Sequence, residues 1–464
     1  MTALPLAPGR PKVRTGPALL DAAVRLAGLA ALWLSLLLTA YWWSAGGGIQ
    51  ALGHWPDALL STGRLTGLAS ADLLLVQVLL MARVPVLERA YGQDRLARLH
   101  RLVGFTGLNL MLAHLLLITW GYAAGSVARW VATLWDLTWH YPGMLLAVAG
   151  TLCLLLVAVT SVRAARARLR YESWHLLHLY AYLGVGLALP HQLWTGQEFL
   201  ASRGATLYWW TAWAVAAGAL LWWRLLVPLE RSMRHRLRVV SVAHEGDDVV
   251  SVYLTGMGVA PAPRRRRPVL LVALPGRARA KPCPPPLAVG GPDGRSLRIS
   301  VKALGDGSSQ LAALRPGTRA LIEGSLRAAH RAGPPPRAVA FLGAGVGITP
   351  LRALAEGMAY DPGNAVLLYR FRERPLFERE FHTLARERGL EVLWLPGRRR
   401  SPDSWLGSNA GTVTDEQALR YWVPDIADRD VYVCGPDAWM ADVRRSLAAL
   451  GVPEDQVHLE SFGW

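Results

Sequence analysis

Lysine and cysteine are scarce in this chain of 464 residues. Its only lysines are Lys12, Lys281 and Lys302, although lysine and arginine together number 50, so almost all of the basic charge is arginine. Such a bias is typical of GC-rich coding and indicates a bacterial source. The cysteines number only three and have neither a metal-ligand spacing nor the even count of a disulfide framework.

The chain is not poor in hydrophobic residues, as a disordered or fibrous chain would be, so both of these classes are excluded. Hydrophobic residues make up 52% of the sequence and crowd into its first half. Acidic residues number only 33, and the resulting formal net charge of +17 would suit nucleic-acid binding. The arginines lie where apolar segments end, however, which is typical of membrane loops. We therefore expect a lipid bilayer and no nucleic acid as the partner.

Six apolar stretches are long enough to cross about 30 Å of hydrocarbon as helices. The first is too long and too poorly flanked to be a cleaved signal peptide. The sequence thus predicts a six-helix transmembrane bundle over residues 24–230. The predicted spans are 24–43, 65–87, 99–122, 141–162, 174–194 and 207–227.

Arginine clusters predict the orientation of these spans. They flank the start of the first span and follow the second, fourth and sixth, while the alternate loops hold little charge. Because positive loops stay inside, we expect a multi-pass protein of the bacterial plasma (inner) membrane with both termini cytoplasmic. Residues 1–23 would be a cytoplasmic tail.

Beyond residue 231 the pattern becomes that of a soluble protein. Short β-rich runs separated by turn residues predict an antiparallel β-barrel over residues 231–332. After the run Gly-Pro-Pro-Pro at 333–336, strands alternate with helices, which predicts a doubly wound α/β domain over residues 333–464. The chain is therefore expected to be a multi-domain membrane protein.

Histidines within the predicted spans are the first candidate functional residues, because an imidazole in lipid is costly unless it has a partner. His100 and His114 are 14 residues apart on the third span, about 21 Å of helix; His178 and His191 are 13 apart on the fifth, about 19.5 Å. The matching depths place two facing imidazoles at each of two levels. Two stacked haems require such axial ligands.

Two alternatives stay open for these histidines. His175 lies one turn from His178 and competes with it as the inner ligand. Thirteen residues also turn a straight helix about 220° beyond three full turns, so His178 and His191 face one partner only if Pro190 kinks or rotates the helix. Histidines that merely hydrogen-bond between helices are the simpler interpretation.

A glycine-rich loop is the second candidate site. "FLGAGVGITP" at 341–350 follows a predicted strand and precedes a helix, where small residues and helix amides suit a pyrophosphate. "VYVCGP" at 431–436 ends a later strand at the same sheet edge. The two loops predict a dinucleotide-binding site.

Six spans with these histidine spacings, a following barrel, the glycine loop, Cys-Gly-Pro and an aromatic C-terminus together resemble the ferric reductase/NADPH oxidase family of flavocytochromes b. The resemblance implies a transmembrane oxidoreductase. It would pass electrons from cytoplasmic NADPH or NADH through FAD and two b-type haems to an external acceptor, ferric iron or oxygen. The cofactors would do the chemistry, so no catalytic acid, base or nucleophile is expected.

The resemblance also implies roles for single residues. Its nucleotide-binding residues would be Gly343, Gly345, Gly347, Thr349 and Pro350, with Arg370 near the ribose, a 2′-phosphate near residues 398–400, and Cys434, Gly435 and Pro436 beside the nicotinamide. The FAD pyrophosphate would meet Lys302, Gly305, Gly307 and Ser308, and Phe462 or Trp464 would cover the flavin ring.

One departure from the family concerns the flavin. Its members carry a His/Arg-Pro-aromatic-Ser/Thr motif that grips FAD, and the corresponding residues 284–287 here are Pro-Pro-Pro-Leu. The aromatic ring and the hydroxyl are both missing, which leaves FAD binding open. The alternative is a haem-bearing membrane subunit with a vestigial flavin domain, supplied with electrons by a separate flavin reductase.

Overall fold

The computed structural model divides the chain into two compact units, Met1–Val227 and Pro228–Trp464. It describes residues 16–166, 168–169, 171–200, 202–246, 248–257, 270–273, 287–290, 296–302, 311–323 and 338–460.

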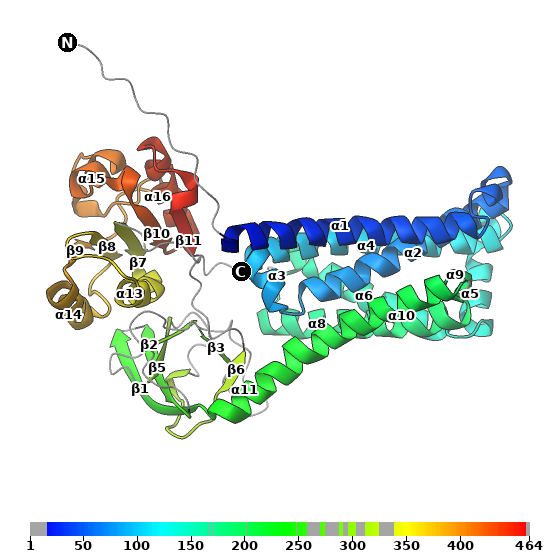
Figure 1. Cartoon of the computed structure of the whole chain (residues 1–464), viewed down its shortest axis with the longest axis horizontal. Helices are drawn as coiled ribbons and strands as arrows, with labels where there is room; N and C mark the ends of the chain where they lie inside the picture. Colours follow the sequence, from blue (N-terminus) through cyan, green and yellow to red (C-terminus); the bar gives the residue numbers. More distant parts are fainter. Residues whose placement is uncertain are drawn as a thin grey trace, which may run out of the picture. The chain divides into compact units, whose positions relative to one another are not determined.

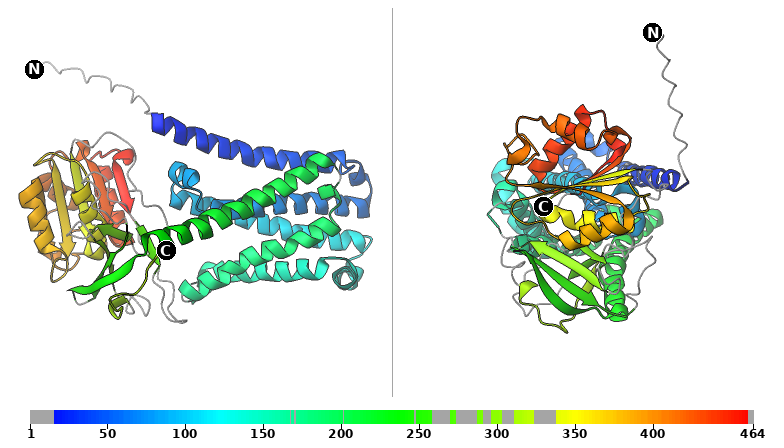
Figure 2. Two further views of the ribbon diagram at one scale, coloured as in Figure 1. Left: turned by 60° about the horizontal axis from the view of Figure 1, so that its bottom comes forward. Right: turned by 90° about the vertical axis from the view of Figure 1, so that its left-hand side faces the viewer.

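Long helices lying side by side form the first unit (Figures 1 and 2). They are α1 (Gly16–Ala45), α2 (Trp55–Leu80), α4 (Gln93–Tyr122), α6 (Met144–Ser161), α8 (Tyr171–Trp194) and α10 (Arg203–Ala219). Shorter elements join them: η1 (Gln50–Gly53), α3 (Pro85–Tyr91), η2 (Val127–Arg129), α5 (Trp130–His140), α7 (Arg163–Arg166) and α9 (Gln197–Leu200). A π-helix, η3 (Leu220–Leu226), continues α10 into α11 (Val227–His235).

Within the part of the chain that the structure describes, five helices are long and apolar enough to cross a membrane. They are Leu19–Ala45, Trp55–Leu80, Arg95–Tyr122, Met144–Ser161 and Arg203–His235. The helix α8 is 24 residues long, but its histidines and internal Pro190 lower its hydropathy, and it is not among the five. The count of six spans therefore stays a prediction.

The second predicted span is wrong in its limits. It was expected over 65–87, whereas α2 begins at Trp55 and ends at Leu80, and α3 begins at Pro85. Proline has no N–H to donate and fits the first turn of a helix rather than its interior. Arg83, with φ of 63°, makes the turn between the two helices.

Close pairs of helices organise the first unit: α2 packs along α4, and α6 packs along α8. Small residues allow this approach, as is common between membrane helices. Gly150 of α6 and Gly184 of α8 face each other so closely that a Cβ on either would lie within 3 Å of the other's carbonyl oxygen. On the other pair, Ser70 donates to the carbonyl of Gly107 at 2.8 Å.

An antiparallel sheet opens the second unit. Its order is β1-β2-β5-β4-β3-β6, with β1 (Arg238–Gly246), β2 (Val249–Thr255), β3 (Leu270–Ala273), β4 (Leu287–Gly290), β5 (Leu297–Lys302) and β6 (Leu321–Glu323). Backbone hydrogen bonds of 2.9 Å from Val239 to Thr318 and from Ala320 to Leu237 join the start of β1 to the segment before β6. The sequence did not predict β4, and a closed barrel stays a prediction.

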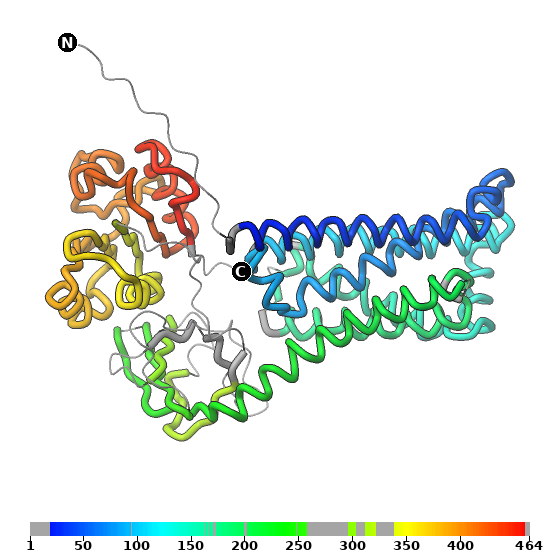
Figure 3. Tube along the Cα trace, viewed as in Figure 1, coloured from blue at the N-terminus to red at the C-terminus, as the bar shows by residue number. Residues whose placement is uncertain are grey.

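A parallel sheet with the order β11-β10-β7-β8-β9 follows; Figure 3 shows the course of the chain by colour. Its strands are β7 (Val339–Ala344), β8 (Ala365–Phe371), β9 (Leu390–Pro396), β10 (Asp430–Cys434) and β11 (Val457–Glu460). Its helices are α13 (Ile348–Gly357), α14 (Glu378–Arg388), α15 (Asp415–Trp422) and α16 (Asp437–Ala449), with the short turns η4 (Gly345–Gly347), η5 (Ser408–Ala410), η6 (Ile426–Asp428) and η7 (Glu454–Gln456). The sequence missed α15 and β11.

Both faces of the parallel sheet are buried. Successive side chains of a strand point to opposite faces, so two neighbouring residues of β7 show what covers each face. Phe341 packs into the cluster that contains α13 and α14, and Leu342 packs into the cluster that contains α15 and α16. The predicted doubly wound parallel sheet is thereby confirmed.

Arg388 of α14 stabilises the end of α13, and this makes a first prediction. Its guanidinium donates to the carbonyl oxygens of Ala355, Glu356 and Met358 at 2.5–2.6 Å, groups that otherwise lack helical partners. Arg388→Met should cost about 2 kcal/mol and raise hydrogen exchange over α13. The exposed Arg386→Met is the control; equal exchange in both variants would contradict the assignment.

Candidate functional site

The two histidines of α4 are held by backbone carbonyls of α2. Nδ1 of His114 lies 2.8 Å from the carbonyl oxygen of Gly63, and Nδ1 of His100 lies 3.3 Å from that of Gln77. A ring that donates from Nδ1 keeps Nε2 unprotonated and available to a metal, the usual arrangement of ligating histidines. The helix α2 thus fixes both rings of α4.

The inner pair of histidines comes together as the sequence predicted. The ring centroids of His100 and His178 are 6.0 Å apart, and Nδ1 of His178 lies 3.4 Å from Oγ of Ser161 on α6. Two imidazoles on opposite sides of one metal ion, each bonded at about 2 Å, would place their centroids about 6 Å apart. This geometry fits a metal ion with two axial imidazole ligands.

The outer pair is His114 and His191, whose rings are close enough to interact electrostatically. A Cβ at Gly67 would overlap the His114 ring, so glycine makes the space for it. Nδ1 of His191 is buried with no hydrogen-bond partner in the described part of the chain. The inner pair thus brings a ring of α4 and a ring of α8 together, and the outer pair is close enough for the two rings to interact electrostatically.

Each pair supplies two imidazoles. Among the residues that the structure describes, no group of three or more His, Cys, Asp or Glu could hold one. A metal ion held by two imidazoles needs its remaining ligands from elsewhere, and the porphyrin ring of a haem supplies them. The donor set fits haem better than a structural metal site.

In the second unit, the glycine loop and the Cys-Gly-Pro loop meet at the carboxyl edge of the parallel sheet. Gly343 of β7 pairs with Cys434 of β10. A Cβ at Gly347 would overlap the carbonyl of Cys434 and lie 2.8 Å from the amide nitrogen of Gly435. Gly345 adopts φ of 56°, a left-handed conformation that favours glycine. The sheet edge thus brings the two predicted loops into contact.

Unpaired polar atoms lie beside this edge. The Thr349 hydroxyl is buried with no hydrogen-bond partner among the described residues, and so is Nε of Arg370 at the end of β8. Pro350 is buried next to Thr349. Burial, with Arg399 and Arg372 nearby, lowers the pKa of Arg370. A buried hydroxyl and a buried guanidinium nitrogen without partners among the described residues fit an anionic nucleotide.

Sequence reasoning missed Tyr369, whose hydroxyl hydrogen-bonds to the glycine loop. Its hydroxyl donates to the carbonyl of Gly345 at 3.3 Å and accepts from the amide of Leu376 at 3.1 Å. The one signal in the sequence was a tyrosine within the apolar strand that leads to Arg370.

The predicted flavin residues lie mostly outside the described residues. Lys302 ends β5 and pairs with Asp248 at 2.9 Å. The predicted flavin residues that lie outside the described residues are Gly305, Gly307, Ser308, Phe462, Trp464 and residues 284–286.

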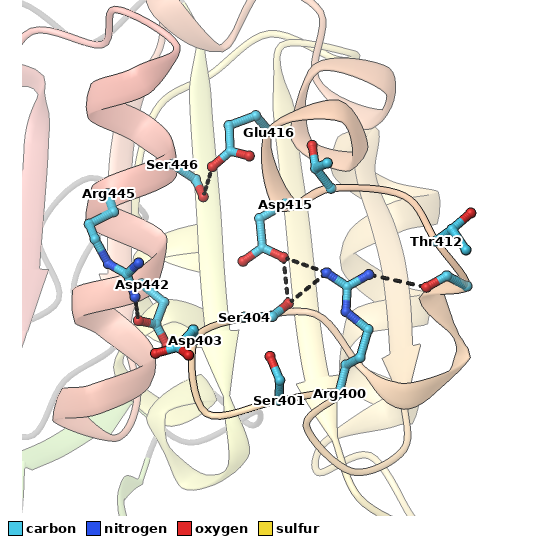
Figure 4. A pocket seen from close by; sticks show the side chains of 12 residues that line it. Arg400, Ser401, Asp403, Ser404, Thr412, Asp415, Glu416, Asp442, Arg445 and Ser446 are labelled. Carbon is cyan, nitrogen blue, oxygen red and sulfur yellow. Dashed lines mark hydrogen bonds and ion pairs between the residues drawn. The ribbon is translucent and has the colours of Figure 1, made fainter.

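A polar pocket of about 560 Å³ lies between the 400–415 segment and α16 (Figure 4). Its charges satisfy one another: Arg400 lies 3.4 Å from Asp415 and donates to the carbonyl of Val413 at 2.7 Å, while Arg399 pairs with Asp442. Arg399 also donates to the carbonyl of Ser404 at 2.6 Å, so both arginines bond to their own loop, and Arg398 and Arg400 are the exposed members of the 398–400 run.

Comparisons with known proteins agree with the two sites. Residues 66–189 match the family model "Ferric reductase like transmembrane component", and residues 341–445 match "Oxidoreductase NAD-binding domain". The chain thus carries a ferric reductase-like transmembrane domain and an oxidoreductase NAD-binding domain. Its domain pair matches that of ferric reductase-like flavocytochromes with FAD/NAD domains, which confirms the resemblance at the level of the domains.

Curated relatives match only part of the chain. The ferredoxin reductase component of 3-ketosteroid-9-alpha-monooxygenase from Mycobacterium tuberculosis is 35% identical over 26% of this chain and 32% of its own length. A flavohemoprotein from Vibrio cholerae is 30% identical over 37% of this chain and 44% of its own length. The chain spans less than half the length of these relatives.

Among solved structures, the chain is similar to the flavohem-like FAD/NAD binding domain of nitric oxide dioxygenase from Vibrio cholerae. That match covers 50% of this chain and 100% of the other, with 22% identity and a TM-score of 0.37.

Tyr369 gives a prediction of pH dependence. Burial raises its pKa from 10.0 to about 12, so the folded state favours the neutral phenol. The stability that this provides is complete below pH 10 and is lost as the pH rises to about 12, by about 3 kcal/mol. Tyr369→Phe should remove this part of the alkaline loss in denaturant unfolding. The exposed Tyr421→Phe should keep it, and an identical loss in all three proteins would contradict the prediction.

Proposed function

We propose that this chain is a plasma-membrane oxidoreductase that passes electrons from cytoplasmic NAD(P)H, through FAD and two b-type haems, to ferric iron or oxygen outside. The observation that carries the proposal is the pairing of imidazoles between α4 and α8, with ring centroids 6.0 Å apart in the inner pair. The ferric reductase-like match over residues 66–189, which contains both α4 histidines, supports it.

The proposed ligands are His100 with His178 for the inner haem and His114 with His191 for the outer haem. Haem iron, when bound, accepts and donates one electron at a time. The chain's part is to fix the four rings, through the α2 carbonyls for the α4 histidines, and to keep the path between the levels apolar. Electrons that leave a negative interior gain about 2.3 kcal/mol per 100 mV.

At the cytoplasmic end, the glycine loop would hold the nucleotide pyrophosphate, and Cys434 to Pro436 would border the nicotinamide. FAD, when bound, takes up a hydride and releases single electrons. Curated relatives named as a ferredoxin reductase component and a flavohemoprotein support FAD and NAD(P)H as cofactors. Because Arg399 and Arg400 hold their own loop, a 2′-phosphate would meet Arg370 and Arg398, which favours NADPH.

A second candidate function is a haem-bearing membrane subunit fed by a separate flavin reductase. The proline run at 284–286, in place of the flavin motif, favours it. Measurement of bound FAD separates the two functions: about one FAD per chain supports the complete oxidoreductase, and none supports the subunit.

Removal of one histidine should remove one haem. We expect His191→Ala to lose the outer haem, because a single imidazole holds haem weakly, and to halve the pyridine haemochrome signal per chain. The control is His140→Ala, whose side chain is 69% exposed beside Asp136. Two haems in the His191 variant would refute the ligand assignment.

Anaerobic NADPH should reduce the haems of the purified chain in the presence of FAD. The expected readout is the appearance of reduced b-type absorption bands, followed by their loss when a ferric chelate is added. His114→Ala should keep the inner band reducible and lose most reduction of the chelate. Unchanged bands in the wild-type chain would exclude direct electron transfer from the nucleotide.

A further inference from the structure

One face of the β2–β5 ladder packs against the parallel sheet of the same unit. Side chains alternate along a strand, so residues paired at every second position share a face. The pairs Tyr253 with Arg298 and Val249 with Lys302 lie on one such face. Val249 belongs to the buried cluster of the parallel sheet, and β5 contacts the glycine turn η4.

Arg298 carries a positive charge into this contact. Its side chain is fully buried, and it makes a forked ion pair with Glu380 of α14, with Nη1–Oε1 at 2.5 Å and Nη2–Oε2 at 3.1 Å. Two parallel hydrogen bonds fix direction as well as distance. The pair therefore ties the antiparallel sheet to the parallel-sheet domain in one orientation.

Glu380 extends the connection to the nucleotide site. Its second oxygen lies 2.5 Å from Nε of Arg352 on α13, and Arg352 also pairs with Glu356 at 3.2 Å. The helix α13 begins at the glycine loop. A single carboxylate thus joins the strand β5 to the helix whose N-terminus faces the proposed pyrophosphate.

The backbone before α14 holds Glu380 in this place. Phe377 has φ of 59°, a left-handed conformation that is uncommon for a bulky residue. Its ring is buried, and the guanidinium of Arg298 lies 4.1 Å from the ring centroid. The surrounding contacts fix this strained position, as is common where a geometry matters for function.

We propose that Arg298, Glu380 and Arg352, the interdomain clasp, are positioning residues that set the distance between the nicotinamide and the flavin. This inference rests on the proposed function. Hydride transfer moves two electrons and one hydrogen nucleus from the nicotinamide ring to the flavin, which oxidises the nucleotide and reduces FAD. It requires the two rings at about 3–3.5 Å. None of the three side chains takes part in the chemistry.

Stability alone does not account for the clasp. A buried ion pair contributes little more than well-packed apolar residues of the same size. What the pair adds over apolar packing is a directional contact that fixes the orientation of the two sheets. Glu380 pairs with Arg298 of β5 and with Arg352 of α13, so one carboxylate orients the strand and the helix relative to each other.

The test compares Glu380→Gln and Arg298→Lys with the wild-type full chain. We expect Glu380→Gln to slow flavin reduction by NADPH about 100-fold in stopped flow, with little change in the nucleotide dissociation constant. Hydrogen exchange should rise together over β5 and α13. Arg298→Lys keeps the charge without the fork and should give an intermediate rate.

The matched control is Glu454→Gln, which breaks the exposed pair of Arg444 and Glu454 at 2.8 Å. An exposed pair contributes little, so this variant should behave as wild type. Raised exchange with a wild-type rate of flavin reduction would overturn the positioning role, and unchanged exchange in both clasp variants would overturn the clasp itself. If NADPH and NADH fail to reduce the wild-type chain, the proposed function fails, and the exchange measurement still decides whether the clasp joins the two segments.

Discussion

The membrane unit is organised by the cost of an imidazole in hydrocarbon. A ring nitrogen there needs a partner, and α2 supplies one to each histidine of α4 through the carbonyls of Gly63 and Gln77. With Nδ1 held in this way, Nε2 of each ring is left for a ligand. Close packing of α2 on α4 and of α6 on α8 follows from the same constraint, because the rings reach their partners only where small residues let the helices approach.

Polar groups in the second unit differ in whether they have hydrogen-bond or ion-pair partners. In the pocket of Figure 4, Arg400 pairs with Asp415 at the start of α15. At the sheet edge, by contrast, the Thr349 hydroxyl and Nε of Arg370 are buried without partners among the described residues. Burial of a polar group costs free energy unless a hydrogen bond compensates for it. The edge with the unpaired groups is therefore the better candidate for the ligand.

A buried ion pair connects the two sheets of the second unit. Arg298 and Glu380 are far apart in the sequence and meet in a forked ion pair in which the arginine is fully buried. Such a pair fixes orientation more than it stabilises. In the proposed function, hydride transfer depends on distances of a few ångströms, and this ion pair would hold them constant where one domain meets the next.

The sequence alone determined the features that depend on local composition. Hydropathy showed where helices are long enough for a bilayer, and the order of glycines showed the turn after β7, because both depend on residues close along the chain. The break between Leu80 and Pro85 shifted one span, since apolar composition does not report where a helix turns.

Tertiary structure decided the rest. His178 rather than His175 meets His100 at 6.0 Å, a choice that helical periodicity left open because it depends on how α8 is rotated against α4. Arg298 looked like an ordinary strand residue. Only the fold brings Glu380 to it across 82 positions, since partners that far apart in the chain leave no periodic pattern in the sequence.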